Sequence, residues 1–87
     1  MEIIMRAKIY SKNDCGWCVK AKELLEQHKI EVVEFNIEYR ESWKTMLKDE
    51  CEKLGFIPKT VPQIWVDENY VGGYQELYDF IYPSKES

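Results

Sequence analysis

The sequence predicts an α/β fold in which a four-stranded mixed sheet is flanked by three helices, in the order βαβαββα. Two features of the chain lead to this prediction. Four short stretches have the apolar pattern of strands, and three longer stretches repeat apolar residues at helical spacing. A helical stretch also separates the first two strands, whereas a short turn separates the last two. We therefore expect the first pair to be parallel with a right-handed crossover and the last pair to form an antiparallel hairpin.

The first strand and helix are predicted on either side of a polar break. Residues 5–10 alternate apolar and basic side chains, which indicates a strand with one face directed inward. Residues 11–14 are turn formers, and a helix is expected to begin near Cys15 or Gly16. The apolar face of this helix is expected to hold Ala21, Leu24, Leu25 and His28.

The second strand and helix follow the same alternation of patterns. Residues 30–37 return to a period of two, with Val33 and Phe35 on one face. A helix over residues 41–54 then ends at Gly55, a typical C-cap. Its apolar stripe is expected to consist of Trp43, Met46, Leu47, Cys51 and Leu54.

The last third of the chain predicts a hairpin and a terminal helix. Residues 63–66 and 70–72 read as strands joined by a turn at residues 67–69. Gly73 then opens a helix whose apolar face is expected to hold Tyr74, Leu77, Tyr78 and Ile81.

Length and charge narrow the class of protein. Eighty-seven residues fit a single domain over residues 1–87, and the formal net charge is −4. An acidic chain is a poor nucleic-acid binder, because such proteins need a basic patch to displace counterions. No apolar run has the length of a membrane span, and the N-terminus lacks the pattern of a signal peptide. We therefore expect a cytoplasmic protein that binds neither nucleic acid nor membrane.

The pair Cys15 and Cys18 carries the most specific chemistry in the sequence. In the cytoplasm thiols stay mostly reduced, so such a pair is more often catalytic or metal-binding than a structural disulfide. A strand, a short turn and C-x-x-C at the start of a helix form a redox motif. Backbone N–H groups at the helix start favour a thiolate, so we expect Cys15 to be the nucleophile with a lowered pKa. Cys18 lies one turn later and is expected to be the resolving thiol, while Lys12 adds positive charge nearby.

Other interpretations of the cysteines are weaker. A zinc site usually needs two more ligands at comparable spacing, and only Cys51 and His28 remain, each alone on a helix. Cys51 lies on an apolar stripe, which favours a buried structural thiol. Trp17 stands between the two cysteines, where burial is difficult, so we expect it on the surface in contact with substrate.

Three segments together resemble the glutaredoxin family, most of all its small bacterial and bacteriophage members. They are residues 11–18 (SKNDCGWC), residues 60–67 (TVPQIWVD) and residues 71–74 (VGGY). The resemblance implies a thioredoxin fold, a cis peptide bond before Pro62 and glutathione as the reductant. Without it, Pro62 reads only as the first residue of a strand, and an X-Pro bond in a folded protein is cis about one time in twenty.

The resemblance also implies a glutathione-binding groove. In it Lys12 meets the glycine carboxylate, and Val61 pairs with the cysteinyl backbone of glutathione. Tyr74 and the two residues after it hold the γ-glutamyl end at the start of the last helix, which is also where a carboxylate binds on physical grounds. The full set of glutathione-binding residues predicted here is Lys12, Trp17, Thr60, Val61, Pro62, Gly73, Tyr74, Gln75 and Glu76.

The chain departs from the family pattern at two places, and these leave alternatives open. Gly16 and Trp17 replace the usual Pro-Tyr between the cysteines, and Gly at this position also occurs in thioredoxins. Gln75-Glu76 replaces a Thr or Ser followed by Asp. One alternative is therefore a dimer that binds a [2Fe-2S] cluster through Cys15 and glutathione, and another is a reductant served by a thioredoxin reductase.

The sequence thus predicts a monomeric dithiol glutaredoxin without a tightly bound cofactor. We expect it to reduce protein disulfides and glutathione mixed disulfides, with glutathione as reducing co-substrate. Ribonucleotide reductase is a candidate partner through the resemblance alone.

Overall fold

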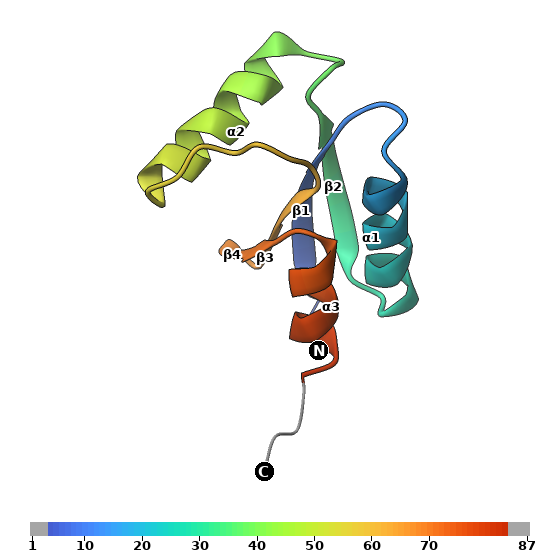
Figure 1. The fold of residues 1–87 in the computed structure, drawn as a ribbon. Coiled ribbons are helices and arrows are strands. Elements are labelled where there is room, and N and C mark those ends of the chain that lie inside the picture. The colour runs from blue at the N-terminus through green and yellow to red at the C-terminus, as the bar shows by residue number, and fades with distance from the viewer. Residues whose placement is uncertain (1–3, 84–87) are drawn as a thin grey trace.

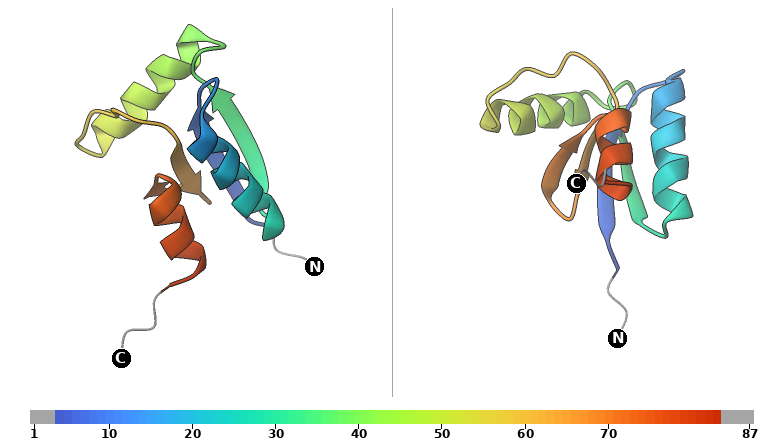
Figure 2. Two further views of the ribbon diagram at one scale, coloured as in Figure 1. Left: turned by 45° about the vertical axis from the view of Figure 1, so that its right-hand side comes forward. Right: turned by 60° about the horizontal axis from the view of Figure 1, so that its bottom comes forward.

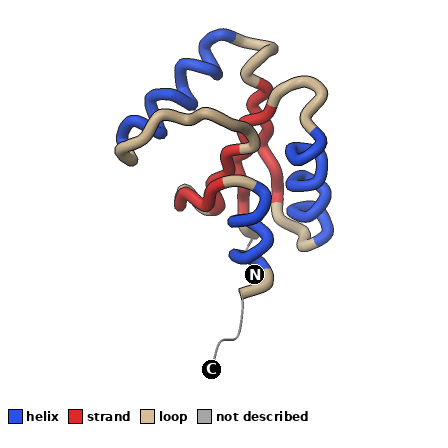
Figure 3. The backbone as a smooth tube through the Cα atoms, in the orientation of Figure 1, coloured by secondary structure: helices blue, strands red, loops and turns tan. Residues whose placement is uncertain are grey.

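The structure is a computed structural model that describes residues 4–83, so the expectations for the ends of the chain lie partly outside it. Figure 3 shows the predicted alternation of strands and helices along the backbone. The elements are β1 (Arg6–Ser11), α1 (Gly16–Gln27), β2 (Glu31–Asn36), α2 (Glu41–Lys53), β3 (Gln63–Val66), β4 (Asn69–Gly72) and α3 (Tyr74–Ile81). Among the residues described, no helix has both the length and the apolar composition needed to cross a bilayer.

The sheet has the predicted mixed pairing. Its strand order is β2-β1-β3-β4. β1 pairs in parallel with β2, and β3 pairs antiparallel with both β1 and β4. The β3–β4 hairpin turns at Asp67 and Glu68, whose φ angles of 49° and 70° are those of a type I′ turn. The fold is therefore the α/β arrangement that the sequence patterns predicted, and it is the thioredoxin fold that the resemblance implied.

The helices form layers on the two faces of the sheet. α1 and α3 cover one face, and α2 lies on the opposite side (Figures 1 and 2). The larger core lies under α1 and α3 and consists of Ala7, Ile9, Ala21, Leu24, Leu25, Ile30, Ile64, Val66 and Leu77. This core fixes the starts of both helices above the same end of the sheet.

A second core lies under α2 and corrects the prediction for the first strand. β1 was expected to bury one face, but Tyr10 and Ser11 are as fully buried as Ile9. Tyr10 packs there with Leu47, Cys51 and Trp65. Both faces of β1 are covered at its C-terminal end because it is a central strand with a helix on each side.

Two predicted apolar stripes are narrower than expected. On α2, Leu47 and Cys51 are buried, whereas Met46 and Leu54 are exposed. On α1, His28 caps the end of the helix and is exposed, with its Nε2 atom 2.7 Å from the Tyr82 hydroxyl. Each helix touches the sheet along a limited line of contact, so residues at the edges of its stripe face solvent. Gly55, with a φ angle of 93°, follows α2 as predicted.

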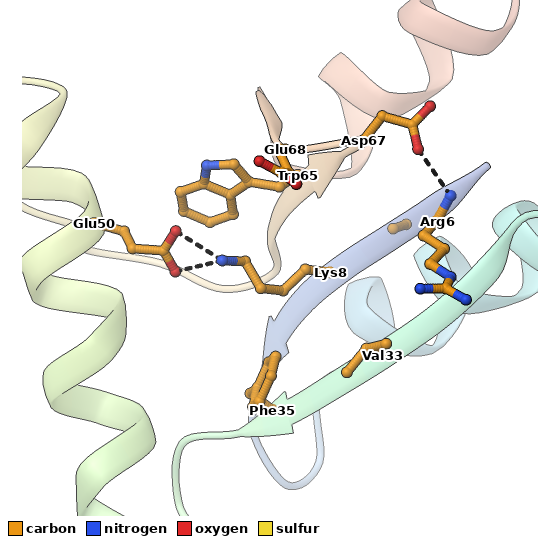
Figure 4. A pocket seen from close by; sticks show the side chains of 9 residues that line it. Arg6, Lys8, Val33, Phe35, Glu50, Trp65, Asp67 and Glu68 are labelled. Carbon is orange, nitrogen blue, oxygen red and sulfur yellow. Dashed lines mark hydrogen bonds and ion pairs between the residues drawn. The ribbon is translucent and has the colours of Figure 1, made fainter.

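An ionic cluster joins α2 to the sheet (Figure 4). The Lys8 ammonium donates to both carboxylate oxygens of Glu50, at 2.7 and 2.6 Å, and the Tyr10 hydroxyl donates to the same carboxylate. Burial raises the pKa of the Glu50 carboxyl, but the hydrogen bonds from Lys8 and Tyr10 and the charge of Lys8 outweigh burial and lower it. Burial and the same carboxylate raise the pKa of Tyr10. The cluster therefore fixes α2, and with it the chain that leads to β3.

Candidate active site

Cys15 lies at the N-cap of α1, as the sequence predicted. Its extended backbone, with φ −114° and ψ 100°, follows Asp14, which has a φ angle of 54°. The Cys15 Sγ atom accepts a hydrogen bond from the Cys18 backbone N–H at 3.2 Å. A sulfur in this position occupies the place of an N-cap oxygen, so the helix start stabilises negative charge on it.

The two cysteines differ in exposure and are close enough to bond. They form a disulfide with their Cα atoms 5.2 Å apart. Cys18 is only 2% exposed, whereas Cys15 is partly exposed. Cys15 is therefore the more exposed of the two cysteines, and Cys18 lies beneath it within bonding distance.

The segment before β3 faces Cys15. The Val61–Pro62 peptide bond is cis, as the resemblance implied. The Cys15 Sγ atom lies 3.8 Å from the Val61 carbonyl oxygen. The backbone of Val61 thus lies beside the Cys15 sulfur.

A groove beside Cys15 brings together most of the predicted binding residues. It has a volume of about 360 Å³ and is lined by Trp17, Thr60, Val61, Pro62, Gly73, Tyr74 and Gln75. Trp17 is 57% exposed, as expected, and its ring lies 5.3 Å from that of Tyr74 and 4.9 Å from the Lys20 ammonium. The starts of α1 and α3 therefore form one wall of the groove and the segment before β3 forms the other.

Lys12 lies in a neighbouring hollow that shares Thr60 and Val61 with the groove. This hollow has a volume of about 170 Å³ and is also lined by Ile37, Leu47, Pro58 and Lys59. Lys59 is a basic side chain that the sequence reasoning missed. Lys59 directly precedes the Thr60-Val61-Pro62 segment, and a residue adjacent to a binding loop often lies on the same surface. This adjacency in the sequence could have indicated that Lys59 lies near the site.

Glu76 was also predicted to bind glutathione, but it is not among the residues that line the groove. Its Oε1 atom accepts a hydrogen bond from the Gly73 backbone N–H at 2.8 Å, so its carboxylate caps α3 beside the groove. Gly72 has a φ angle of 125°, and a Cβ atom there would lie 2.9 Å from Cγ of Glu76. The glycine therefore permits this close approach of the cap to the end of β4.

The remaining candidates lie away from Cys15. Cys51 is buried, as predicted, and burial followed by the Glu50 charge raises the pKa of its thiol, so it is a poor nucleophile. The hollow beside Lys8 is larger, at about 520 Å³, but it contains the ion pair of Figure 4 and no cysteine. Within residues 4–83, no three His, Cys, Asp or Glu side chains are grouped to hold a metal ion.

Comparison with known proteins gives one consistent result. Residues 7–71 match the family model described as glutaredoxin. The chain is 34% identical to glutaredoxin 1 of Escherichia coli K12 over 75 residues, which cover 84% of this chain and 88% of that protein. It is 39% identical to glutaredoxin 1 of Salmonella typhimurium over 67 residues, 75% of this chain and 77% of that one.

Solved structures show the same fold. Glutaredoxin 1 of Francisella tularensis, crystallised with cacodylate, superimposes with a TM-score of 0.64 at 32% identity, covering 92% of this chain and 99% of that chain. A buckwheat glutaredoxin, crystallised with glutathione, has a TM-score of 0.74 at 18% identity and covers 87% of this chain and 67% of that chain.

Proposed function

Because the chain belongs to the glutaredoxin family of thiol–disulfide oxidoreductases, we propose that it reduces protein disulfides and glutathione mixed disulfides with glutathione as electron donor. The observation that carries this proposal is the asymmetry of the cysteine pair. Cys15 is partly exposed at the start of α1, whereas Cys18 is buried within bonding distance.

In the proposed cycle Cys15 is the nucleophile. Its thiolate attacks one sulfur of a substrate disulfide, forms a mixed disulfide and releases the other sulfur as a thiolate. Cys18, as a thiolate, then attacks the Cys15 sulfur and releases the second substrate thiolate. The enzyme is left with the Cys15–Cys18 disulfide, the state seen in the structure.

Two molecules of glutathione complete the cycle. The first attacks the Cys15 sulfur, forms a glutathione mixed disulfide and returns Cys18 to a thiolate. The second attacks the glutathione sulfur of that mixed disulfide, which gives glutathione disulfide and the Cys15 thiolate. Every step exchanges one S–S bond for another, so no further oxidant or reductant is needed.

We assign glutathione to the groove and the adjoining hollow. In this assignment Lys12 binds the glycine carboxylate, and the Val61 backbone pairs with the cysteinyl residue between Thr60 and Pro62. The γ-glutamyl carboxylate faces the unpaired N–H groups at the start of α3. That end of the ligand contacts Trp17, Gly73, Tyr74, Gln75 and Glu76. The continuity of the two hollows through Thr60 and Val61 supports this assignment.

The proposal extends to compartment and partners. A cycle that consumes glutathione suits the cytoplasm, where glutathione keeps thiols reduced. We propose that the enzyme acts there as a monomer, with ribonucleotide reductase as a candidate protein substrate.

A comparison of electron donors tests the proposal. The purified protein would be given a disulfide substrate and NADPH, with either glutathione and glutathione reductase or thioredoxin reductase alone. We expect rapid NADPH oxidation with glutathione and a rate at the background level with thioredoxin reductase. The reverse result would show that glutathione is not the donor.

The [2Fe-2S] alternative makes a different demand on the chain. Such clusters need four ligands, usually cysteine thiolates. One chain offers Cys15 alone, because Cys18 and Cys51 are buried. A site with four ligands would therefore be complete only in a dimer, with one Cys15 thiolate and one glutathione thiolate from each half. Iron analysis and sedimentation of protein purified without oxygen would detect a cluster-bridged dimer.

A further inference from the structure

A row of aromatic rings runs along α3 away from the candidate active site. Ring centroids are 5.3 Å apart between Trp17 and Tyr74, 6.3 Å between Tyr74 and Tyr78, and 4.9 Å between Tyr78 and Tyr82. His28, at the end of α1, closes the row 5.2 Å from Tyr82. We call Trp17, Tyr74, Tyr78 and Tyr82 the aromatic row.

The core does not account for the far half of this row. Leu77 is fully buried, and Tyr74 and Ile81 pack against the larger core. Tyr78 and Tyr82 remain 43% and 45% exposed. They follow Tyr74 at intervals of four residues, so they share its face of α3 and present their rings to solvent. Rings held against each other at the surface provide contact area that needs little ordering when a partner binds.

The row begins at the place where a substrate must bind. Trp17 and Tyr74 line the groove beside Cys15, and a disulfide under attack must bring one sulfur to the Cys15 Sγ atom. The residues on one side of that substrate cysteine therefore lie near the row. On the other side of Cys15, the hollow around Lys12 and Lys59 adjoins a second hollow that Glu38 and Glu41 line, so that surface carries charges of both signs. Apolar side chains of a substrate are therefore expected on the side of the aromatic row.

We propose that the aromatic row is the docking surface for apolar side chains flanking the cysteine of a protein disulfide substrate. This inference rests on the proposed function and names its partner class. Tyr74 and Tyr82 are separated by about 12 Å along the helix, from a rise of about 1.5 Å per residue. An extended segment covers that length with about four residues. The occupant is therefore a substrate segment with apolar residues within about four positions of the attacked cysteine.

Two disulfide peptides test this proposal. Each would contain the same intramolecular disulfide, flanked in one peptide by Leu and Phe and in the other by Ser and Gln. Pre-reduced enzyme would be mixed with each peptide, and the second-order rate constant of peptide reduction would be measured. The disulfide of 2-mercaptoethanol serves as a small substrate without flanking residues.

We expect wild-type enzyme to reduce the apolar peptide roughly threefold to tenfold faster than the polar one, the range expected for a few aromatic contacts. The double variant Tyr78→Gln/Tyr82→Gln should lose this preference and keep its rate with the small disulfide. Phe80→Gln is the matched control, because Phe80 is 48% exposed on the same helix and lies outside the row. It should keep the preference.

Each contrary outcome has a distinct meaning. Equal rates with both peptides in the wild type, or an unchanged preference in the double variant, would overturn the docking surface. If the wild-type enzyme does not reduce the small disulfide at all, the proposed function itself is overturned. If the double variant does not fold, Tyr78→Gln alone carries the comparison. A protein that sediments as a dimer, and as a monomer in the Tyr78 variant, would show that a second copy occupies the row and would also overturn the proposal.

Discussion

Replacing Glu50 by alanine should destabilise the protein far more than its position on a mostly exposed helix suggests. The carboxylate accepts two hydrogen bonds from the Lys8 ammonium and one from the Tyr10 hydroxyl. Without it, the hydroxyl of the fully buried Tyr10 loses its partner, which costs about 1–3 kcal/mol. The Lys8 side chain is 31% exposed, so water partly replaces its lost partner, and this adds about 1 kcal/mol at most.

The expected total is a loss of about 1–4 kcal/mol in the free energy of unfolding. For a domain of this size that corresponds to a fall in Tm of roughly 5–30 °C. Urea unfolding at pH 7, followed by circular dichroism, measures the first quantity, and a thermal scan measures the second. Glu52→Ala is the control, because Glu52 is exposed on the same helix and its loss should change stability by less than about 0.5 kcal/mol.

A double-mutant cycle with Tyr10→Phe tests the reasoning itself. Phenylalanine at position 10 has no hydroxyl to leave unpaired, so Glu50→Ala should cost much less in that background than in the wild type. Equal costs in the two backgrounds would refute the claim that the carboxylate acts through Tyr10. A loss no larger than that of Glu52→Ala would refute the whole account of the cluster.

The other predictions concern catalysis and pH. Cys15→Ser should abolish reduction of every disulfide. Cys18→Ser should keep activity on glutathione mixed disulfides but lose reduction of intramolecular protein disulfides. Glutathione-coupled NADPH oxidation measures both variants. Lys12→Gln should raise the KM for glutathione about threefold with little change in kcat, since one ionic contact is lost, while Lys48→Gln on the outer face of α2 should change neither. The pKa of Glu50 is lowered below its ordinary value of 4.5, so the folded state binds fewer protons than the unfolded state near that pH. Its contribution to stability is therefore complete above about pH 5 and lost as the pH falls through the lowered pKa. Unfolding free energies measured from pH 7 to pH 3 should fall more steeply for the wild type than for Glu50→Gln, and parallel curves would contradict this.

Local patterns were sufficient to predict the strands, the helices and the pairing of β1 with β2 and of β3 with β4, but not the antiparallel pairing of β1 with β3. Each element has a period that sequence shows directly, such as the alternation through β1 or the helical stripe of α1. The ionic cluster could not be predicted this way, because Lys8 and Glu50 are far apart in sequence and each reads alone as a solvated charge. The same limit explains the error over β1, since Tyr10 is buried by a helix that follows much later in the chain.

In the candidate site, too, residues close together in the sequence were predicted from local patterns, whereas residues brought together from distant segments were not. Cys15 and Cys18 were found from spacing alone, because both lie within one helical turn. The groove is formed by three separate segments, so its residues were predicted only through the family resemblance. Glu76 stays a predicted ligand contact, and its carboxylate also caps α3; a Glu three residues after the residue that opens a helix was a local signal for this cap. Lys59 was missed because a single lysine in a loop has no periodicity to mark it.

The open space at Gly16 means that a side chain at this position would change the surroundings of the two cysteines without disturbing the packing of the fold. A Cβ atom built at this position would have no neighbour within 4 Å, and Gly16 is the first residue of α1. Proline is well accepted at the first position of a helix, because that residue donates no hydrogen bond within it. Gly16 can therefore be replaced to alter how readily the two thiols form a disulfide, while the packing beneath it stays unchanged. The reduction potential of the cysteine pair can thus be adjusted at this one position without other substitutions in the core.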